Sequence, residues 1–500
     1  MDLFDKTYTK TNEYGEVIGI SHPIVTVVGL PHVKADEMVV FDNNELGQVQ
    51  SIREDVTTIL LFSIDPAKVG QKVTRLDEVL QVKVRQNLLG NVVDAMGTVI
   101  GVIDSTNTNA SKGEYVDELV VDTQPPSMDR RLTVRNQFVT GVSLADVLIP
   151  IGSGQTELVV GDKKTGKTSF LLSVLKQHVN RGGIVVYVLV GANISEIKII
   201  QDFLQKNALS ERAVLVFSST NSPHGHILIS PYTGMAFAEY FKKQGFDVML
   251  ILDNLSTHAM YYREVSILSN KFPGRDSYPG DIFYLHARLL ERAGIIGTDP
   301  TEKGSVTCFP VAQTVQGDLT DYIVSNLISI TDGHLYFDQA EFVKGRRPAI
   351  NIALSVTRLG RQTQSVLLQD INRTISSFLT TKYEKSLQLY HFGSEVSDIL
   401  KKDLELGNTM YEIFNQDTGI VYSLEPMVAF LAMVWAEIFK KDSLEKIIWY
   451  RNNFVDIYEH DQKVKTEIDE LVKADTFDGL IGKVTEHATR LQELCKTKIQ

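Results

Sequence analysis

The stretch Gly161-Asp162-Lys163-Lys164-Thr165-Gly166-Lys167-Thr168 decides the fold of this chain. It has the G-x-x-x-x-G-K-T spacing of a phosphate-binding loop, after the apolar run Glu157–Val160 and before a helical pattern from Ser169. Such a loop turns successive backbone N–H groups toward one anion at the N-terminus of the following helix. Lys167 is expected to reach the β- and γ-phosphates, and the Thr168 hydroxyl to bind Mg²⁺. The sequence therefore predicts a strand–loop–helix unit that binds a nucleoside triphosphate.

The length and composition set broad limits. A chain of 500 residues with 43% hydrophobic and 22% charged residues is typical of a soluble protein with about two to four domains. No apolar run approaches the roughly 18 residues of a membrane span, and Met1–Asp5 is not a secretory signal. The two cysteines, Cys308 and Cys495, favour a reducing compartment without disulfides. A net charge of −12 argues against a protein whose main task is binding nucleic acid, and we expect a cytoplasmic one.

Three segments differ in their periodicity. Residues 1–88 alternate β-rich runs, such as Ile24–Val28, Glu37–Phe41 and Thr57–Phe62, with turns, which predicts an N-terminal β-barrel. Residues 372–500 have apolar residues at helical spacing and predict a C-terminal helical bundle. The helices expected there are Ser386–Leu406, Pro426–Lys440 and Ile468–Cys495.

Residues 89–371 predict a central P-loop α/β nucleotide-binding domain of the RecA-like kind. Its continuous apolar runs are typical of parallel strands covered on both faces, with ligands bound at the carboxyl ends of the strands. The expected strands are Leu158–Val160, Ile184–Val190, Val214–Phe217, Val248–Leu252 and Ser305–Pro310, with helices at Ser169–Arg181 and Pro231–Gln244.

One of these strands ends in a carboxylate, Asp253. In P-loop proteins such a residue holds the Mg²⁺ hydration shell opposite the loop threonine, here Thr168. Any buried strand can end in aspartate, but the complete loop makes the functional interpretation the stronger one. We therefore predict that Asp253 and Thr168 together bind the metal.

Hydrolysis also requires a carboxylate or amide that orients the attacking water. In oligomeric ATPases of this layout, that group follows the strand after the P-loop helix. Here the strand ends in Val190-Gly191-Ala192-Asn193, and Ala192 has no polar side-chain atom. Glu196 lies four residues further on, where a solvated helix face is the simpler interpretation. The chain is therefore predicted to bind ATP without a catalytic carboxylate.

An arginine ends the apolar run that starts at Ala353. Arg358 lies in a loop before Gly360, and by itself a solvated or salt-bridged arginine is the simpler interpretation. In a ring of subunits, however, such an arginine could enter the neighbour's site and stabilise transition-state charge as an arginine finger in trans.

Over nearly its whole length the chain resembles the α subunit of F1-type rotary ATPases. The order of barrel, nucleotide domain and helical bundle is the same, and several long strings match. These strings are Gly29–Met38, Pro150–Gln155, Pro273–Arg292, Asn326–Gly333 and Gly345–Asn351.

The resemblance implies an α3β3 ring in which three such chains alternate with three catalytic β-type subunits around a γ-type central shaft. It implies a complex peripheral to the inner face of the cell membrane, with an α-type site that holds ATP or ADP and Mg²⁺ without turnover. By motif, Lys167, Thr168 and Asp253 would carry the phosphates and the metal. Arg347 and Pro348 would border the adenine, and Ser329 and Arg358 would face the partner's catalytic site.

The chain also departs from the family. Family members usually have glutamine at the position of Ala192, and Arg-Gln at Lys163 and Lys164. The adenine-side glutamines are matched loosely, at Gln416, because the segment Asp417–Tyr422 looks inserted.

The N-terminal helix that grips the peripheral stator in the family is expected to be absent, with the barrel beginning almost at once. A complex without a conventional stator suits the divergent F1-like ATPases of mollicutes, some of which drive gliding motility through a motility apparatus rather than ion transport through a membrane rotor.

Two further functions compete with this one. A self-sufficient catalytic ATPase, such as a homohexameric export ATPase or an RNA translocase, is disfavoured by Ala192 and, for the RNA version, by the acidic charge. A purely structural ring subunit with an empty site is disfavoured by the complete loop.

Overall fold

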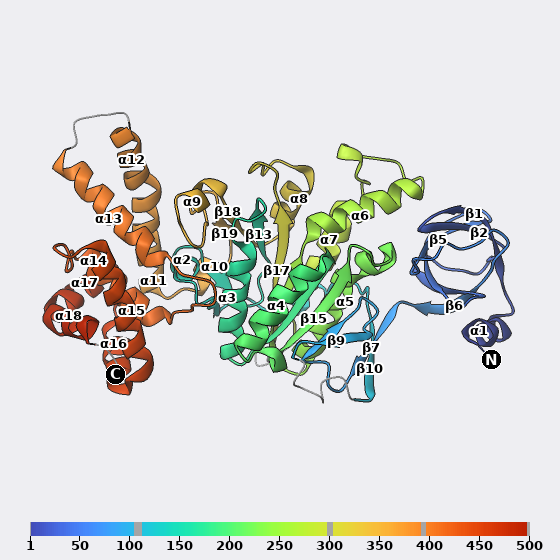
Figure 1. The fold of residues 1–500 in the computed structure, drawn as a ribbon, viewed down its shortest axis with the longest axis horizontal. Helices are drawn as coiled ribbons and strands as arrows, with labels where there is room; N and C mark the ends of the chain where they lie inside the picture. The colour runs from blue at the N-terminus through green and yellow to red at the C-terminus, as the bar shows by residue number, and fades with distance from the viewer. Residues whose placement is uncertain (1, 105–112, 298–303, 392–396, 498–500) are drawn as a thin grey trace. The chain divides into compact units, whose positions relative to one another are not determined.

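The computed structural model describes residues 2–104, 113–297, 304–391 and 397–497 (Figure 1). The chain forms two compact units, each described by itself. The first consists of Met1–Leu132, Gly182–Gln313 and Asp318–Thr331, and the second of Thr133–Arg181, Thr314–Gly317 and Asp332–Gln500. The domain boundaries at residues 88 and 371 stay predictions.

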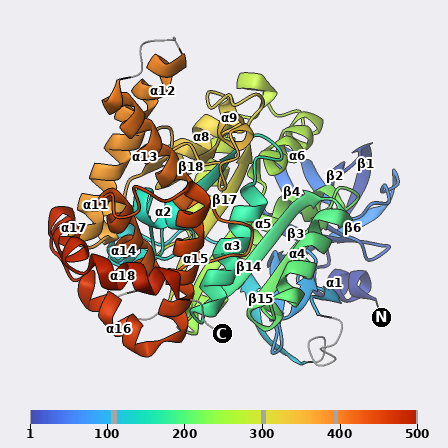
Figure 2. The same cartoon turned by 60° about the vertical axis from the view of Figure 1, so that its left-hand side comes forward.

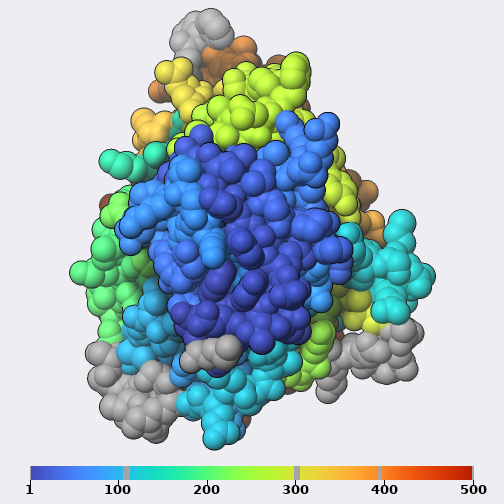
Figure 3. Space-filling model, turned by 90° about the vertical axis from the view of Figure 1, so that its right-hand side faces the viewer, coloured from blue at the N-terminus to red at the C-terminus, as the bar shows by residue number. Residues whose placement is uncertain are grey.

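Six strands of the first unit close into an N-terminal barrel, which confirms that part of the fold class. Alternate side chains such as Val25, Val39 and Ile59 are buried in its core, because strand residues point alternately to the two faces. The barrel residues form one continuous surface, blue in Figure 3. The strands follow the order β1-β2-β5-β4-β3-β6, with β1 Gly15–Ser21, β2 Ile24–Val28, β3 Glu37–Phe41, β4 Leu46–Arg53, β5 Val56–Leu61 and β6 Lys72–Val79.

A helix precedes the barrel, so the expectation that the barrel begins almost at once is wrong. Helix α1, Leu3–Thr11, starts where the side chain of Asp2 accepts a hydrogen bond from the N–H of Asp5 at 3.0 Å. The Thr11 hydroxyl lies 3.1 Å from that of Thr74 on β6, which ties the helix to the barrel wall. Its nine residues are mostly polar and only Thr7 is buried, which is why sequence patterning missed it.

The first unit also contains the larger part of the predicted α/β sheet. Strands β14 (Ile184–Ala192), β15 (Ala213–Ser219), β16 (Asp247–Asp253) and β17 (Ser305–Gln313) run parallel in the order β17-β16-β14-β15. Helices α4 and α5 pack against β14 and β15 (Figure 2). In the sheet, β15 is followed by β8 (Asn91–Val93) and β8 by β9 (Val99–Val102). The remaining elements of the first unit are β7 (Gln81–Arg85), β10 (Tyr115–Val120), η1 (Met128–Arg130), α4 (Ile194–Lys206), η2 (Ser210–Arg212), α5 (His224–Lys243), α6 (Leu255–Leu268), η3 (Arg275–Ser277), α7 (Ile282–Leu290) and α8 (Tyr322–Ile330).

Helix α5 starts at His224, seven residues before the predicted start at Pro231. A proline inside a helix leaves the carbonyl four residues earlier without its N–H donor. Here that carbonyl belongs to Ile227, and it accepts a hydrogen bond of 3.0 Å from the Ser230 hydroxyl. The serine thus compensates the proline, and the helix continues through it.

The second unit holds the strand that leads into the phosphate-binding loop. Strand β13, Glu157–Gly161, is buried along its whole length and pairs in parallel with β18, Gly333–Phe337. The short strand β19, Val356–Thr357, pairs antiparallel with β18. The other elements before residue 366 are β11 (Gln137–Phe138), α2 (Ser143–Leu148), β12 (Ile151–Gly152), α3 (Lys167–Asn180), α9 (Gln339–Val343) and α10 (Gly360–Thr363).

From residue 366 onward the described part of the chain is helical, as predicted. The run expected at Ile468–Cys495 spans parts of three helices. Thr476 accepts a hydrogen bond from the N–H of Gly479 at 3.1 Å and starts the second of them, and His487 separates the second from the third. The helix expected at Pro426–Lys440 ends at Trp435, and within Ser386–Leu406 residues 392–396 lie outside the described residues. The elements are α11 (Val366–Ser377), the π-helix η4 (Phe378–Tyr383), α12 (Glu384–His391), α13 (Asp398–Phe414), α14 (Leu424–Trp435), α15 (Leu444–His460), α16 (Gln462–Leu471), α17 (Phe477–Glu486) and α18 (Ala488–Lys496).

Cys308 and Cys495 are both buried and unpaired, and burial raises the pKa of both thiols. Among the described residues, none of the helices combines the length and the apolar character needed to cross a membrane.

Candidate nucleotide site

The loop from Gly161 to Thr168 joins β13 to α3, as the sequence predicts. A Cβ on Gly161 would lie 2.2 Å from the carbonyl oxygen of Phe337, so only glycine fits there. Gly166 has φ 97°, and a Cβ on it would meet no atom within 4 Å among the described residues. The first glycine therefore packs the loop against β18, and the second leaves open space at the start of the helix.

Lys167 lies inside this loop and is only 8% exposed. Its ammonium donates hydrogen bonds to the carbonyl oxygens of Gly161 at 2.7 Å and Asp162 at 2.6 Å. The Asp162 carboxylate in turn accepts from the Thr314 hydroxyl at 2.6 Å and from the N–H of Gly317 at 3.0 Å. The segment 314–317 thus fixes the loop backbone that holds the ammonium.

The N-terminal end of α3 is suited to an anion. The side chains of Lys163, Lys164, Thr168 and Ser169 are exposed here, and the Thr165 hydroxyl is fixed to the carbonyl of Asp162 at 2.8 Å. The first turn of the helix has no acidic residue, and its backbone N–H groups carry the positive end of the helix dipole. The arrangement can bind phosphate groups.

Asp253 ends β16 in the first unit, as predicted. Its Oδ2 accepts a hydrogen bond of 2.8 Å from the Tyr187 hydroxyl on β14. Burial, together with the nearby Asp253, raises the pKa of Tyr187 well above its usual value, so the hydroxyl stays a donor. Thr168 belongs to the second unit, so the joint binding of Mg²⁺ by Thr168 and Asp253 stays a prediction.

The end of β14 offers no group that could activate water at the predicted position. Ala192 is 6% exposed and carries only a methyl group. Glu196 has a structural task instead: its carboxylate accepts a hydrogen bond of 2.9 Å from the N–H of Asn193 in a capping box at the start of α4. This contact agrees with the simpler interpretation of Glu196.

Arg347 and Gln416 lie together in the second unit. The N–H of Gln416 donates to the carbonyl of Arg347 at 2.8 Å. The Arg347 guanidinium stacks over Phe342 at 3.6 Å from the ring centre, beside Pro348. The Gln416 amide is committed to backbone groups, since it donates to the carbonyl of Gly141 at 2.9 Å and accepts from the N–H of Ser143 at 2.6 Å. An adenine contact by these residues stays a prediction.

The segment Asp417–Tyr422, which looks inserted, packs against α3. The N–H of Gly419 donates to the Ser173 hydroxyl at 2.9 Å, and Lys176 donates to the carbonyl of Gly419, also at 2.9 Å. The segment therefore braces the helix that follows the phosphate loop.

Ser329 and Arg358 are both exposed. Ser329 lies on α8 in the first unit, where its hydroxyl donates to the carbonyl of Ser325 at 2.8 Å. Arg358 follows β19 in the second unit, and its N–H donates to the carbonyl of Asp332 at 3.1 Å. Both side chains are thus accessible in the isolated chain.

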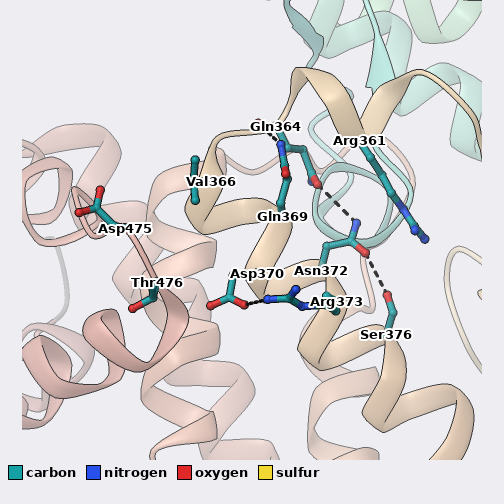
Figure 4. A pocket seen from close by; sticks show the side chains of 10 residues that line it. All are labelled: Arg361, Gln364, Val366, Gln369, Asp370, Asn372, Arg373, Ser376, Asp475 and Thr476. Carbon is teal, nitrogen blue, oxygen red and sulfur yellow. Dashed lines mark hydrogen bonds and ion pairs between the residues drawn. The ribbon is translucent and has the colours of Figure 1, made fainter.

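The second unit also contains a hollow of about 570 Å³ near the start of the helical region (Figure 4). Asp370 accepts from Arg373 at 2.6 Å and from the N–H of Phe477 at 2.8 Å along its wall. The described residues that line it include none of the predicted site residues, so it is distinct from the nucleotide loop. Its lining is Arg361, Gln364, Val366, Gln369, Asp370, Asn372, Arg373, Ser376, Asp475 and Thr476.

Sequence patterning missed Tyr187, Thr314 and Glu157. A tyrosine inside the apolar run of β14 is a weak signal that its hydroxyl has a buried partner. Thr314 and Glu157 gave no signal, because their contacts join segments far apart in the chain.

The fold and the loop define a P-loop nucleotide-binding protein. Residues 141–357 match the model of the ATP synthase alpha/beta family, nucleotide-binding domain. The chain is 33% identical over 467 residues to ATP synthase subunit alpha of Clostridium kluyveri (strain NBRC 12016), which covers 92% of this chain and 90% of that one.

Two other relatives carry the same description. ATP synthase subunit alpha of Carsonella ruddii (strain PV) is 31% identical over 463 residues, covering 91% of this chain and 94% of its own. ATP synthase subunit alpha of Sulfurovum sp. (strain NBC37-1) is 34% identical over 422 residues, which cover 84% of this chain and 82% of that one. The chain belongs to the family of F1-type ATP synthase α subunits.

Proposed function

We propose that this chain is the non-catalytic, ATP-binding α-type subunit of a hexameric F1-like rotary ATPase. It alternates with β-type catalytic subunits in an α3β3 ring around a γ-type shaft, in a complex peripheral to the inner face of the cell membrane. The observation that carries the non-catalytic role is Ala192 at the end of β14, where a water-orienting side chain is needed.

The phosphate loop is suited to hold Mg-ATP or Mg-ADP. Lys167 can exchange its two carbonyl acceptors for phosphate oxygens, and the N–H groups at the start of α3 can donate to the same anion. Thr168 and Asp253 would hold Mg²⁺, because a hydroxyl and a carboxylate are the hard oxygen ligands that this ion prefers. The bound ion neutralises phosphate charge. Arg347, Pro348 and Gln416 would border the adenine.

The catalytic contribution of the chain lies at the neighbouring site. The exposed side chain of Arg358 would reach the nucleotide of the β-type partner and stabilise charge that develops in the transition state, with Ser329 facing the same site.

Purified chain, alone and assembled with its β-type partner, tests this proposal. The isolated chain should bind labelled ATP with Mg²⁺ in the micromolar range or tighter in equilibrium dialysis, and should not hydrolyse it. Robust ATPase activity of the isolated chain would refute the non-catalytic role. Failure to bind ATP would instead favour the structural subunit with an empty site.

A self-sufficient catalytic ATPase would need Glu196 as its general base. The capping contact with Asn193 opposes that role. Glu196→Gln should therefore leave turnover of the assembled complex unchanged, and a large loss of kcat would revive the alternative. The motility alternative depended on a barrel without a preceding helix, and the described residues give it no support.

A further inference from the structure

Three strands of the second unit place a buried glutamate beside the loop of Arg358. Glu157 on β13 is paired with Gly333 on β18, and Gly333 is paired with Thr357 on β19. Thr357 immediately precedes Arg358 in the chain. Glu157 and the arginine loop therefore lie at the same level of this three-stranded sheet.

The side chain of Glu157 on β13 lies over Gly333 of the neighbouring strand β18, on the side of β19. A Cβ on Gly333 would lie 2.4 Å from Oε2 of Glu157 and 2.6 Å from the carbonyl oxygen of Val356. The carboxyl group thus occupies the space that a side chain at position 333 would take, on the strand that pairs with β19. Gly333 is required there because any larger residue would displace the carboxyl group.

The arginine loop is attached to the same place. The N–H of Arg358 donates to the carbonyl of Asp332, the neighbour of Gly333, at 3.1 Å. The Asp332 carboxylate accepts from both the N–H and the hydroxyl of Thr156, at 2.8 Å each, next to Glu157. The backbone that carries Arg358 is thus tied to Asp332 and Thr156, the chain neighbours of Gly333 and Glu157.

We propose that Glu157 is a positioning residue for Arg358: its carboxyl group, lodged over Gly333, fixes β19 and so sets where the guanidinium meets the partner's nucleotide. This inference rests on the proposed role of Arg358 as a finger acting in trans.

The charge of Glu157 matters to this role. Oε2 accepts one hydrogen bond, from the Gln155 amide at 2.7 Å, and Oε1 has no hydrogen-bond partner among the described residues. Burial, with a contribution from Asp332, raises the pKa of Glu157 well above its usual value, against the opposing effects of Gln155 and Arg358. The buried carboxyl group is therefore protonated more readily than an exposed glutamate.

The titratable groups that act on Glu157 are Asp332, which immediately precedes β18, and Arg358 after β19. His334 pairs with Leu158, so its side chain lies on the opposite face of the sheet. Ionisation of Glu157 above its raised pKa would create an anion in the same part of the sheet as Arg358. Turnover should then fall as the pH rises through that pKa.

Steady-state ATPase activity of the assembled complex tests the proposal with two variants. Glu157→Gln keeps the shape of the side chain and cannot ionise, so kcat at pH 7 should stay within about twofold of wild type, and the Glu157-dependent fall of kcat with rising pH should vanish. Glu157→Asp withdraws the carboxyl group from Gly333, so kcat should fall about tenfold with an unchanged KM for ATP.

Leu158→Val is the matched control for loss of one buried methylene from the same strand, on its opposite face. It should lower the thermal midpoint as Glu157→Asp does, but leave kcat unchanged. Wild-type kcat in Glu157→Asp, or superimposable pH profiles for wild type and Glu157→Gln, would overturn the proposal. Arg358→Ala, measured alongside, distinguishes failure of the positioning role of Glu157 from failure of the finger role of Arg358. Normal turnover in Arg358→Ala refutes the finger role itself.

Discussion

The hydroxyl of Tyr187 donates a hydrogen bond of 2.8 Å to Oδ2 of Asp253 from the neighbouring strand of the parallel sheet. The carboxylate at the end of β16 is therefore oriented by a residue in the middle of β14. A ligand held in this way by an outer partner loses less freedom when it binds a metal.

Tyr187→Phe should weaken Mg²⁺-dependent ATP binding to this chain about tenfold, because Asp253 loses the donor that orients it. Binding of ATP without Mg²⁺ should not change. Equilibrium dialysis across a Mg²⁺ titration measures both. Tyr232→Phe removes another hydroxyl from the same unit, one that donates to the carbonyl of Leu285, and should leave both affinities as in wild type. Identical Mg²⁺ titrations for Tyr187→Phe and wild type would contradict the positioning of Asp253.

Lys167→Ala should reduce the affinity of this chain for ATP by about a hundredfold or more, because the loop loses its only buried ammonium for the phosphates. The assembled complex should keep part of its turnover, since the proposed function puts the catalytic site mainly on the partner. Dialysis of the isolated chain and ATPase assays of the complex report these separately. Lys198→Ala, on the exposed side of α4, is the control, and complete loss of turnover in Lys167→Ala would speak against a non-catalytic site.

Arg358→Ala should lower the turnover of the complex by roughly 10³-fold, because the partner's transition state loses a positive charge. ATP binding to this chain should survive. Arg361→Ala removes a second exposed arginine three residues away, and should keep near-normal activity. Equal activity of the two variants would remove the finger role.

The buried pair His258 and His286 predicts acid sensitivity of the first unit. Nδ1 of His258 lies 3.1 Å from Nε2 of His286, and its Nε2 lies 3.0 Å from the carbonyl oxygen of Leu228, an arrangement suited to two neutral rings. Burial lowers the pKa of His258 to about 4, and burial with the nearby His258 lowers that of His286 well below its usual value.

Because the unfolded chain takes up the His258 proton near pH 6.5 and the folded chain only near pH 4, the contribution of His258 to stability is full above pH 6.5 and is lost as the pH falls from about 6.5 to about 4. The loss from His258 alone amounts to roughly 3 kcal/mol when complete. Urea unfolding of the first unit between about pH 7 and pH 4.5 measures the slope. His258→Gln should flatten it, although the variant is less stable at pH 7. An unaltered slope in His258→Gln would contradict the prediction.

The sequence by itself determined the three-part architecture and the location of the phosphate loop. These depend on local signals: glycine spacing, period-two strands, continuous buried strands and helical periodicity each act over a few residues. Ala192 and Asp253 could be placed at strand ends for the same reason. Local signals were weaker at helix boundaries, where Ser230 compensates Pro231 inside α5 and Thr476 divides the last helical run.

Only the tertiary structure decided which side chains position the site. Three contacts join segments that lie from 66 to 176 residues apart in the chain. They are the hydrogen bond from Tyr187 to Asp253, the hydrogen bond from Thr314 to Asp162, and the packing of Glu157 over Gly333. The spacing of residues along a chain carries no information about such pairs, because strand order and register bring them together only after the sheet has formed. The burial that raises the pKa of Glu157 arises in the same step, since the carboxyl group is solvated in the unfolded chain.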